Sequence, residues 1–193
     1  DNDPLANQLP FLLGLCQSIY SDRYPLPQGC QSLVDRAMRL CYQPYMEGYI
    51  AGHPDPRLVP TLKDLQQQLT AFHEPAAREL ALSMEIYTQG SLDLFSHQTT
   101  IHDVDAHCRM TVYDIKDLGN SLKPLAMRVL TNAIWNKLVQ NRIRGRNTYI
   151  VFDEIYLLFK DEYSAEFLKT LWKRSRKYGG IITGITQNVE DLL

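Results

Sequence analysis

The spacing of apolar residues predicts helices in the first part of the chain. Residues 9–20 group their apolar side chains as an amphipathic helix does. Residues 30–45 place theirs at intervals of three and four: Leu33, Val34, Ala37, Leu40 and Cys41. These intervals match the period of an α-helix and not the alternation of a strand. We therefore expect a helix in each segment, with its apolar face packed into a core rather than onto a membrane.

Two further helices are expected after a proline-rich loop over residues 51–60. Thr61 and Asp64 have the spacing of a capping box, which favours a helix start at that point. Pro75 suits the first turn of the next helix, and Gly90 suits its end. About four helices and no strand make residues 1–109 a mainly helical unit.

The pattern changes near residue 110, where β-branched and aromatic residues become frequent. Strands are predicted near residues 110–115, 148–153 and 181–186, and helices over 121–142 and 164–178. Strand, helix and strand in this order imply parallel pairing. We therefore expect residues 110–193 to form an α/β unit with a doubly wound parallel sheet that is buried on both faces, whose ligands collect at the carboxyl ends of the strands.

Composition and charge support two different units. The chain is 45% hydrophobic and 22% charged, as is usual for globular domains. The net charge of −2 hides a contrast, because residues 1–109 carry 13 acids and 7 bases whereas residues 110–193 carry 9 acids and 13 bases. No apolar run approaches the length of a membrane span. The four cysteines lack a metal-like spacing, so we expect them to be reduced, and His102, His107 and Cys108 are not predicted to bind zinc.

Polar residues follow the predicted strands at one edge of the expected sheet. Asp114 lies at the end of the first strand, Asp153 and Glu154 lie at the end of the second, and Gln187 follows the third. An aspartate at such an edge can hold a water of a magnesium shell, a glutamate can orient an attacking water, and a glutamine can sense the terminal phosphate. The alternative is structural, because acids also end strands where the following helix begins and its dipole favours negative charge.

Several stretches resemble the VirB-four ATPases, which power type IV secretion and conjugation, especially the branch found on mobile elements of Gram-positive bacteria. The similar segments are "GSLDLF", "YDIKDLG", "YIVFDEIYLLF" and "FLKTLWKRSRKYGGIITGITQNVEDLL", in this order within residues 86–193. The resemblance implies a partial RecA-like P-loop NTPase core over residues 110–193, with a Walker B strand. Residues 1–109 would then be the large all-helical insertion of that family.

The resemblance also implies roles for individual residues and a bacterial ATP-binding motor. Asp153 would direct Mg²⁺ through a water, Glu154 would be the catalytic base, and Gln187 would be the sensor glutamine. Arg176 or Arg174 would reach into the nucleotide site of a neighbouring subunit, although bases in a last helical turn also complement the helix dipole or form a solvated face. The implied cofactors are ATP and Mg²⁺. They would bind to a longer protein of which this chain is a part, and tight binding of either to this chain alone is not expected.

One part of the family pattern is missing from the chain. None of its glycines lies in the phosphate-loop motif G-x-x-x-x-G-K-[ST], the Walker A loop. The simplest interpretation is that the chain begins after that loop and stops before the last strands of the core. We therefore expect the isolated chain to be inactive.

The resemblance implies partners as well. These are the other subunits of a homo-hexameric ring and the membrane components of a type IV secretion system, which would hold the protein in the cytoplasm at the cytoplasmic face of the membrane. A turn with Arg142, Arg144 and Arg146 is interpreted first as solvated and second as a partner interface, and contact with nucleic-acid phosphates stays open.

Three alternative functions remain open from the sequence. The first is a DNA-translocating motor of the conjugative coupling or FtsK and HerA type, which shares the strand-end acids and the glutamine. The second is a non-catalytic helical interaction module of the secretion machinery. The third is a generic α/β domain without a nucleotide role.

Overall fold

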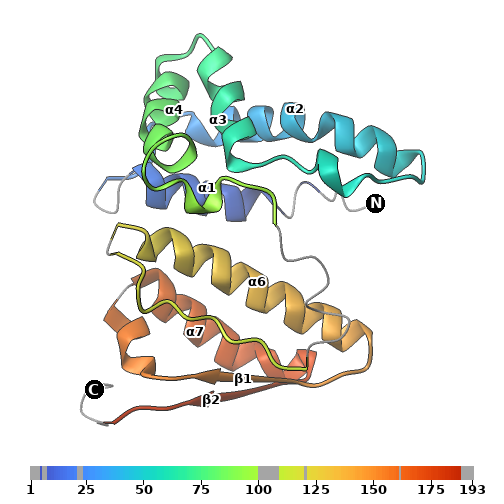
Figure 1. Cartoon of the computed structure of the whole chain (residues 1–193), viewed down its shortest axis with the longest axis vertical. Helices are drawn as coiled ribbons and strands as arrows, with labels where there is room; N and C mark the ends of the chain where they lie inside the picture. Colours follow the sequence, from blue (N-terminus) through green and yellow to red (C-terminus); the bar gives the residue numbers. More distant parts are fainter. Residues whose placement is uncertain are drawn as a thin grey trace. The chain divides into compact units, whose positions relative to one another are not determined.

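The computed structural model describes residues 5, 8–20, 24–99, 109–119, 121–160 and 162–187, omitting the side chains of residues 160, 162 and 163. The chain divides into two compact units, residues 1–117 and residues 118–193. The first is helical and the second contains a small sheet (Figure 1). The assignment of residues 1–109 to a helical insertion and of residues 110–193 to a RecA-like core stays a prediction.

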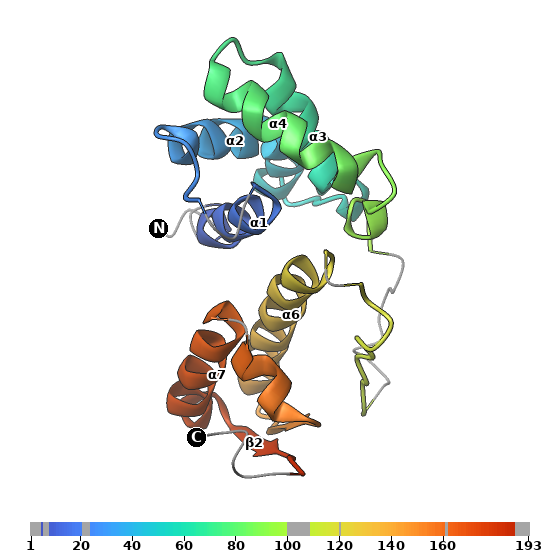
Figure 2. The ribbon, with the colours of Figure 1, turned by 90° about the vertical axis from the view of Figure 1, so that its left-hand side faces the viewer.

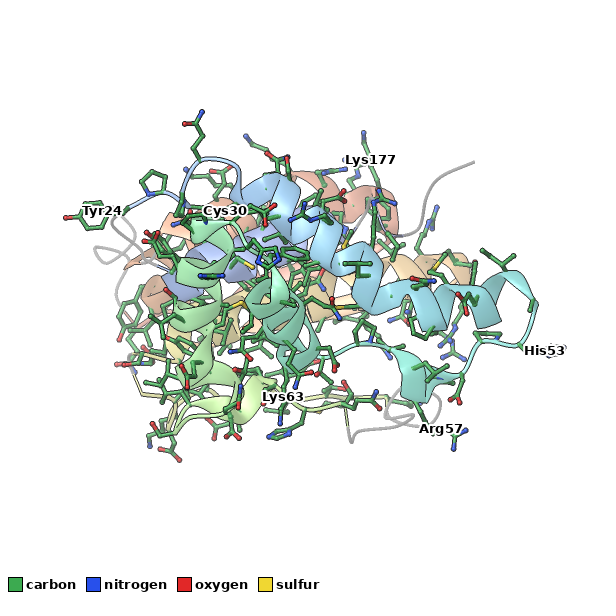
Figure 3. The ribbon with its side chains drawn as sticks, turned by 90° about the horizontal axis from the view of Figure 1, so that it is seen from above. Tyr24, Cys30, His53, Arg57, Lys63 and Lys177 are labelled. Atoms are coloured by element: carbon green, nitrogen blue, oxygen red, sulfur yellow. The ribbon has the colours of Figure 1, made fainter. Side chains whose placement is uncertain are left out.

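The four predicted helices of the first unit are confirmed. They are α1 (Leu9–Tyr20), α2 (Cys30–Ile50), α3 (Leu62–Ala71) and α4 (Pro75–Thr88), with the 3₁₀ turns η1 (Pro56–Leu58) and η2 (Asp93–Phe95). Helix α2 contains Pro44 and continues to Ile50, five residues beyond the predicted end at residue 45. Tyr49, on this extension, stacks on Tyr45 one turn earlier with ring centroids 6.3 Å apart, and such pairs stabilise a helix. Figure 3 shows this unit from above, with Cys30 at the start of α2 and His53 beyond its end.

The core of the helical unit is mainly apolar, and the buried residues of its described part include no Asp, Glu, Lys, Arg or His. Met38, Leu69, Leu80 and Met84 are fully buried. Cys16 is buried as well, and the loss of hydration raises the pKa of its thiol to about 12. The thiol therefore stays protonated at neutral pH. No helix in the described part of the chain has the length and apolar character needed to cross a membrane.

The capping box at the start of α3 is confirmed. The Thr61 amide donates to Asp64 Oδ2 over 2.7 Å, and the Asp64 amide donates to Thr61 Oγ1 over 3.4 Å. The two residues thus satisfy backbone donors that the first turn of a helix leaves without partners.

The second unit has the predicted order of strand, helix and strand. It contains α6 (Lys123–Ile143), β1 (Thr148–Phe152), η3 (Ile155–Lys160), α7 (Glu162–Arg174), η4 (Ser175–Tyr178) and β2 (Gly180–Gly184). The two strands are parallel, and their register runs from Thr148 opposite Gly180 to Phe152 opposite Gly184. The predicted parallel pair is therefore confirmed. Helices α6 and α7 lie side by side in this unit (Figures 1 and 2).

The sheet is covered on one face, which corrects the expectation of burial on both. Ile150 packs with Leu138 of α6 and Leu171 of α7, and Phe152 and Ile182 are partly buried against this cluster. The alternate residues point the other way, and Tyr149 and Val151 are 73% and 61% exposed. Within the described residues, α6 and α7 are the helices that supply this core, so the opposite face keeps an exposed apolar surface.

The predicted strand near residues 110–115 is wrong. Residues 109–119 have no regular strand, and the sheet of the described chain consists of β1 and β2. Met110 and Val112 are 79% and 74% exposed, so the β-forming side chains that suggested a strand have no core to pack against. Asp114 Oδ1 accepts the Lys116 amide over 2.9 Å, which closes a turn in place of an extended ladder. Asp114 therefore does not end a strand of the sheet.

Candidate functional site

The carboxyl edge of the sheet brings Glu154 and Gln187 together. Asp153 and Glu154 directly follow β1, and Gln187 lies three residues after β2. Because the strands are parallel, both segments leave the sheet at the same edge. Gln187 Nε2 donates a hydrogen bond to Glu154 Oε1 over 2.7 Å, across 33 positions of sequence. The shared edge predicted for these residues is therefore present, whereas their chemical roles remain predictions.

A bulge places Glu154 in this position. The Ile185 amide donates to the Phe152 carbonyl over 2.8 Å, and the Ile185 carbonyl accepts the Ile155 amide over 3.0 Å. In a regular parallel ladder the second bond would come from Glu154, so β1 carries one extra residue at this point. Glu154 has a φ of 51°, a left-handed conformation that costs a residue with a side chain about 1–3 kcal/mol. Bulges of this kind redirect side chains at sheet edges.

Asp153 is the group at this edge best suited to a cation. Its Oδ1 accepts the Glu154 amide over 3.0 Å, and no other group of the described residues hydrogen-bonds to the carboxylate, which is exposed. A carboxylate oxygen is the kind of ligand that Mg²⁺ prefers, directly or through a water. The described residues contain no cluster of three or more His, Cys, Asp or Glu side chains that could hold a metal. Asp153 therefore fits a single contact with a hydrated ion, and His102, His107 and Cys108 lie outside the described residues.

The two candidate arginines lie at the opposite edge of the sheet. Arg174 ends α7 and Arg176 belongs to η4, and both precede β2. Five-residue strands separate the two edges by roughly 13 Å. The Arg174 guanidinium carbon lies 5.4 Å from the centre of the Trp135 ring, a cation–π contact, whereas Arg176 is exposed. The structure thus does not bring either arginine to Glu154 of the same chain.

A second basic turn lies beside η4. Arg142, Arg144 and Arg146 surround the connection between α6 and β1, and all three are exposed. The Thr148 amide donates to the Gly179 carbonyl over 3.0 Å, which fixes the two connections next to each other. Residues 118–152 contain no acid, so the amino edge of the sheet is strongly basic.

Sequence reasoning missed the backbone features that shape the site. It did not predict the bulge, the left-handed Glu154 or the 3₁₀ turn η3. One signal was present, because an isolated glycine within a strand pattern, here Gly184, often marks a bulge or a close approach. The stacking of Arg174 on Trp135 joins residues 39 positions apart and has no local signal.

Comparisons with known proteins show a similarity to solved structures. No protein-family model matches the chain, and no curated protein sequence matches it. The structure of VirB4 of Thermoanaerobacter pseudethanolicus is similar, with a TM-score of 0.73 and 26% sequence identity. The match covers 98% of this chain and 52% of that one, so the chain spans about half the length of the protein it matches. The predicted resemblance is therefore confirmed, and the chain is VirB4-like in fold and sequence over nearly its whole length.

Proposed function

We propose that the chain is part of an ATP-hydrolysing motor that energises type IV secretion or conjugative transfer. The observation that carries this proposal is the hydrogen bond from Gln187 to Glu154 beside Asp153, at the carboxyl edge of two parallel strands. Ligands of α/β sheets bind at such edges. The likeness to VirB4 supports the same assignment, with residues 110–193 belonging to a partial RecA-like core and residues 1–109 to a helical insertion.

In this function each group at the carboxyl edge has a separate task. Asp153 would hold a water of the Mg²⁺ shell through a carboxylate oxygen, and Glu154 would accept a proton from the attacking water. The bond from Gln187 fixes the orientation of the Glu154 carboxylate. Mg²⁺ bound with ATP would neutralise the charge of the phosphates. Gln187 would report the state of the terminal phosphate to β2.

The proposed motor acts as a homo-hexameric ring at the cytoplasmic face of the membrane, attached through the membrane components of the secretion system. The position of Arg176 supports a ring of some kind. An arginine at the amino edge lies too far from Glu154 of its own chain to touch the same phosphate. It can serve a nucleotide only if a neighbouring subunit presents its carboxyl edge there.

The isolated chain is expected to show no ATPase activity above background and no tight ATP binding. Residues 1–193 contain no phosphate-loop motif, so backbone amides and a lysine are not supplied to hold the β- and γ-phosphates. The measurement is calorimetric titration of the chain with ATP and Mg²⁺, together with phosphate release. A longer protein that contains both this chain and a phosphate loop serves as the positive control. Micromolar binding at a single site of the isolated chain would contradict the prediction, and absence of ATPase activity in the longer protein would favour the non-catalytic interaction module.

A DNA-translocating motor is the second candidate function, favoured by the basic amino edge. The connections before β1 and β2 lie side by side, and together with the helix ends that lead into them they carry seven bases: Arg142, Arg144, Arg146, Lys173, Arg174, Arg176 and Lys177. Lys177 is labelled in Figure 3. Such a surface attracts nucleic-acid phosphates, and the attraction weakens with salt.

The second candidate predicts that the chain binds DNA through this edge. Fluorescence anisotropy with a labelled oligonucleotide should give binding at low salt that weakens steeply as salt rises. The triple variant Arg142→Gln, Arg144→Gln and Arg146→Gln should lose at least about tenfold in affinity, since it removes three phosphate contacts. Exchange of Arg36, Arg39 and Arg78 in the helical unit is the matched control. Equal binding by the two triple variants, or no binding at low salt, would remove this candidate.

A further inference from the structure

Gly184 and Ile155 meet directly beneath the turn that carries the two carboxylates. Gly184 is the last residue of β2, and Ile155 is the first residue after Glu154. A Cβ placed on Gly184 would lie 2.7 Å from Ile155 Cδ1 and 3.3 Å from Ile155 Cγ2. It would also lie 3.5 Å from Trp172 Cη2, an ordinary van der Waals contact. A methyl group at position 184 therefore has no room unless Ile155 moves.

Ile155 is the anchor of the carboxylate turn. Its side chain is only 5% exposed, and its amide donates to the Ile185 carbonyl. The Ile185 amide returns a hydrogen bond to the Phe152 carbonyl. Only Asp153 and Glu154 lie between these two attachment points. A displacement of the Ile155 backbone would therefore be taken up by the bulge, where Glu154 already has a left-handed backbone.

We propose that Gly184 is a positioning residue for Glu154. Because Gly184 lacks a side chain, Ile155 can pack against the end of β2. This packing holds Glu154 where Gln187 can donate a hydrogen bond to it. Both partners of that hydrogen bond are tied to the same contact, since Gln187 follows Gly184 by three residues and Glu154 precedes Ile155 by one. The effect on turnover rests on the proposed function, whereas the effect on the Glu154–Gln187 hydrogen bond does not.

The hydrogen bond itself can be followed in the chain by NMR. The side-chain amide signal of Gln187, assigned by its loss in Gln187→Leu, reports its partner. The Glu154→Ala chain gives the position of this signal when the partner is absent. The Gly184→Ala chain should shift the signal at least halfway to that position. A signal that stays at its wild-type position would mean that Ile155 turns aside without moving Glu154, and the proposal would be wrong.

Two further variants separate positioning from a general loss of stability. Ile155→Val removes Cδ1, the atom nearest to the added methyl group, so the double variant Gly184→Ala/Ile155→Val should return the Gln187 signal toward its wild-type position. Gly180→Ala is the matched control at the other end of β2. A Cβ there would lie 2.8 Å from Ser175 Cβ, 3.0 Å from Leu138 Cδ1 and 3.3 Å from the Ser175 carbonyl oxygen, a more rigid clash at the edge of the sheet opposite the carboxylates. It should lower the unfolding temperature without moving the Gln187 signal.

Failure of a variant to fold would not leave the proposal open. If Gly184→Ala does not fold, Ile155→Ala serves in its place, because it removes the side chain that packs against Gly184 without adding any atoms. This variant should also move the Gln187 signal toward its position in Glu154→Ala. An unchanged signal in Ile155→Ala, or failure of Ile155→Val to rescue Gly184→Ala, would overturn the proposal. So would a Gly180→Ala chain whose signal moves as far as that of Gly184→Ala.

In the longer protein the same variants should change kcat more than KM. A displacement of about 1 Å in a reacting group costs up to about 100-fold in rate, so Gly184→Ala should lower kcat by about 10- to 100-fold. KM for ATP should stay within about threefold, because the phosphate loop of the longer protein supplies the main contacts to the phosphates. An altered Gln187 signal without a change in kcat would reject Glu154 as the catalytic base but keep its positioning by Gly184. A lowered kcat with an unaltered Gln187 signal would reject the positioning.

Discussion

Replacing Glu154 with glutamine is expected to lower ATP turnover of the longer protein by about 10² to 10⁴-fold, the usual contribution of a general base. Glutamine has nearly the same shape, and its amide oxygen can still accept the hydrogen bond from Gln187 Nε2. The substitution therefore keeps the local geometry and removes the ability to accept a proton. Nucleotide affinity should change little, since Asp153 and the phosphate loop are unaltered.

Steady-state phosphate release and nucleotide binding should be measured on the same preparations. Glu166→Gln is the matched control, because Glu166 lies on α7 of the same unit and its Oε2 is 3.6 Å from Lys169 Nζ in an exposed ion pair. Exposed pairs of this kind contribute at most about 1 kcal/mol to stability, so this variant should keep full turnover. If Glu154→Gln retained more than about a third of the activity, against the loss expected of a general base, Glu154 could not be that base.

The helices and the parallel pair were predictable because their signals are local. The grouping of apolar residues predicted α1 and α2, the pair Thr61 and Asp64 marked the start of α3, and Pro75 and Gly90 marked the limits of α4. A helix between two predicted strands favoured parallel pairing of the strands near residues 110–115 and 148–153. The first of these two strands is absent from the described structure, so that prediction was wrong. Propensity alone cannot place a strand, because β-forming residues become a strand only where a neighbour supplies hydrogen bonds and a core. The parallel partner of β1 proved to be β2.

The candidate site was predictable as far as strand order determines it. Parallel strands place their carboxyl ends together, so the meeting of Glu154 with Gln187 follows from topology. The φ of Glu154 and the contact between Gly184 and Ile155 do not follow, because both depend on how one extra residue is accommodated in a closed ladder. The position of Arg174 on Trp135 likewise depends on how α6 and α7 pack. Tertiary contacts thus decide the details that matter most for chemistry.

Replacing Arg176 with lysine is expected to lower turnover of the assembled longer protein by about 10³ to 10⁵-fold while leaving its stability and nucleotide affinity nearly intact. Arg176 is exposed and follows Ser175, which is buried, so its side chain lies outside the core of its own unit. A planar, permanently charged guanidinium stabilises a developing phosphoryl charge much better than a flexible ammonium. Arg174→Lys is the matched control, since Arg174 is already engaged with Trp135 and should affect mainly stability.

Mixing two inactive proteins tests whether Arg176 acts between subunits. A subunit with Arg176→Lys keeps Glu154, and a subunit with Glu154→Gln keeps Arg176. In a cyclic ring assembled at random from equal amounts, about a quarter of the interfaces join an intact Glu154 to an intact Arg176. Activity should therefore recover to a substantial fraction of wild type, although each protein alone is inactive. Roughly 13 Å separates the two edges within one chain, so such recovery has no explanation inside a subunit. Lost thermal stability in Arg176→Lys, with no recovery on mixing, would instead assign Arg176 a structural role.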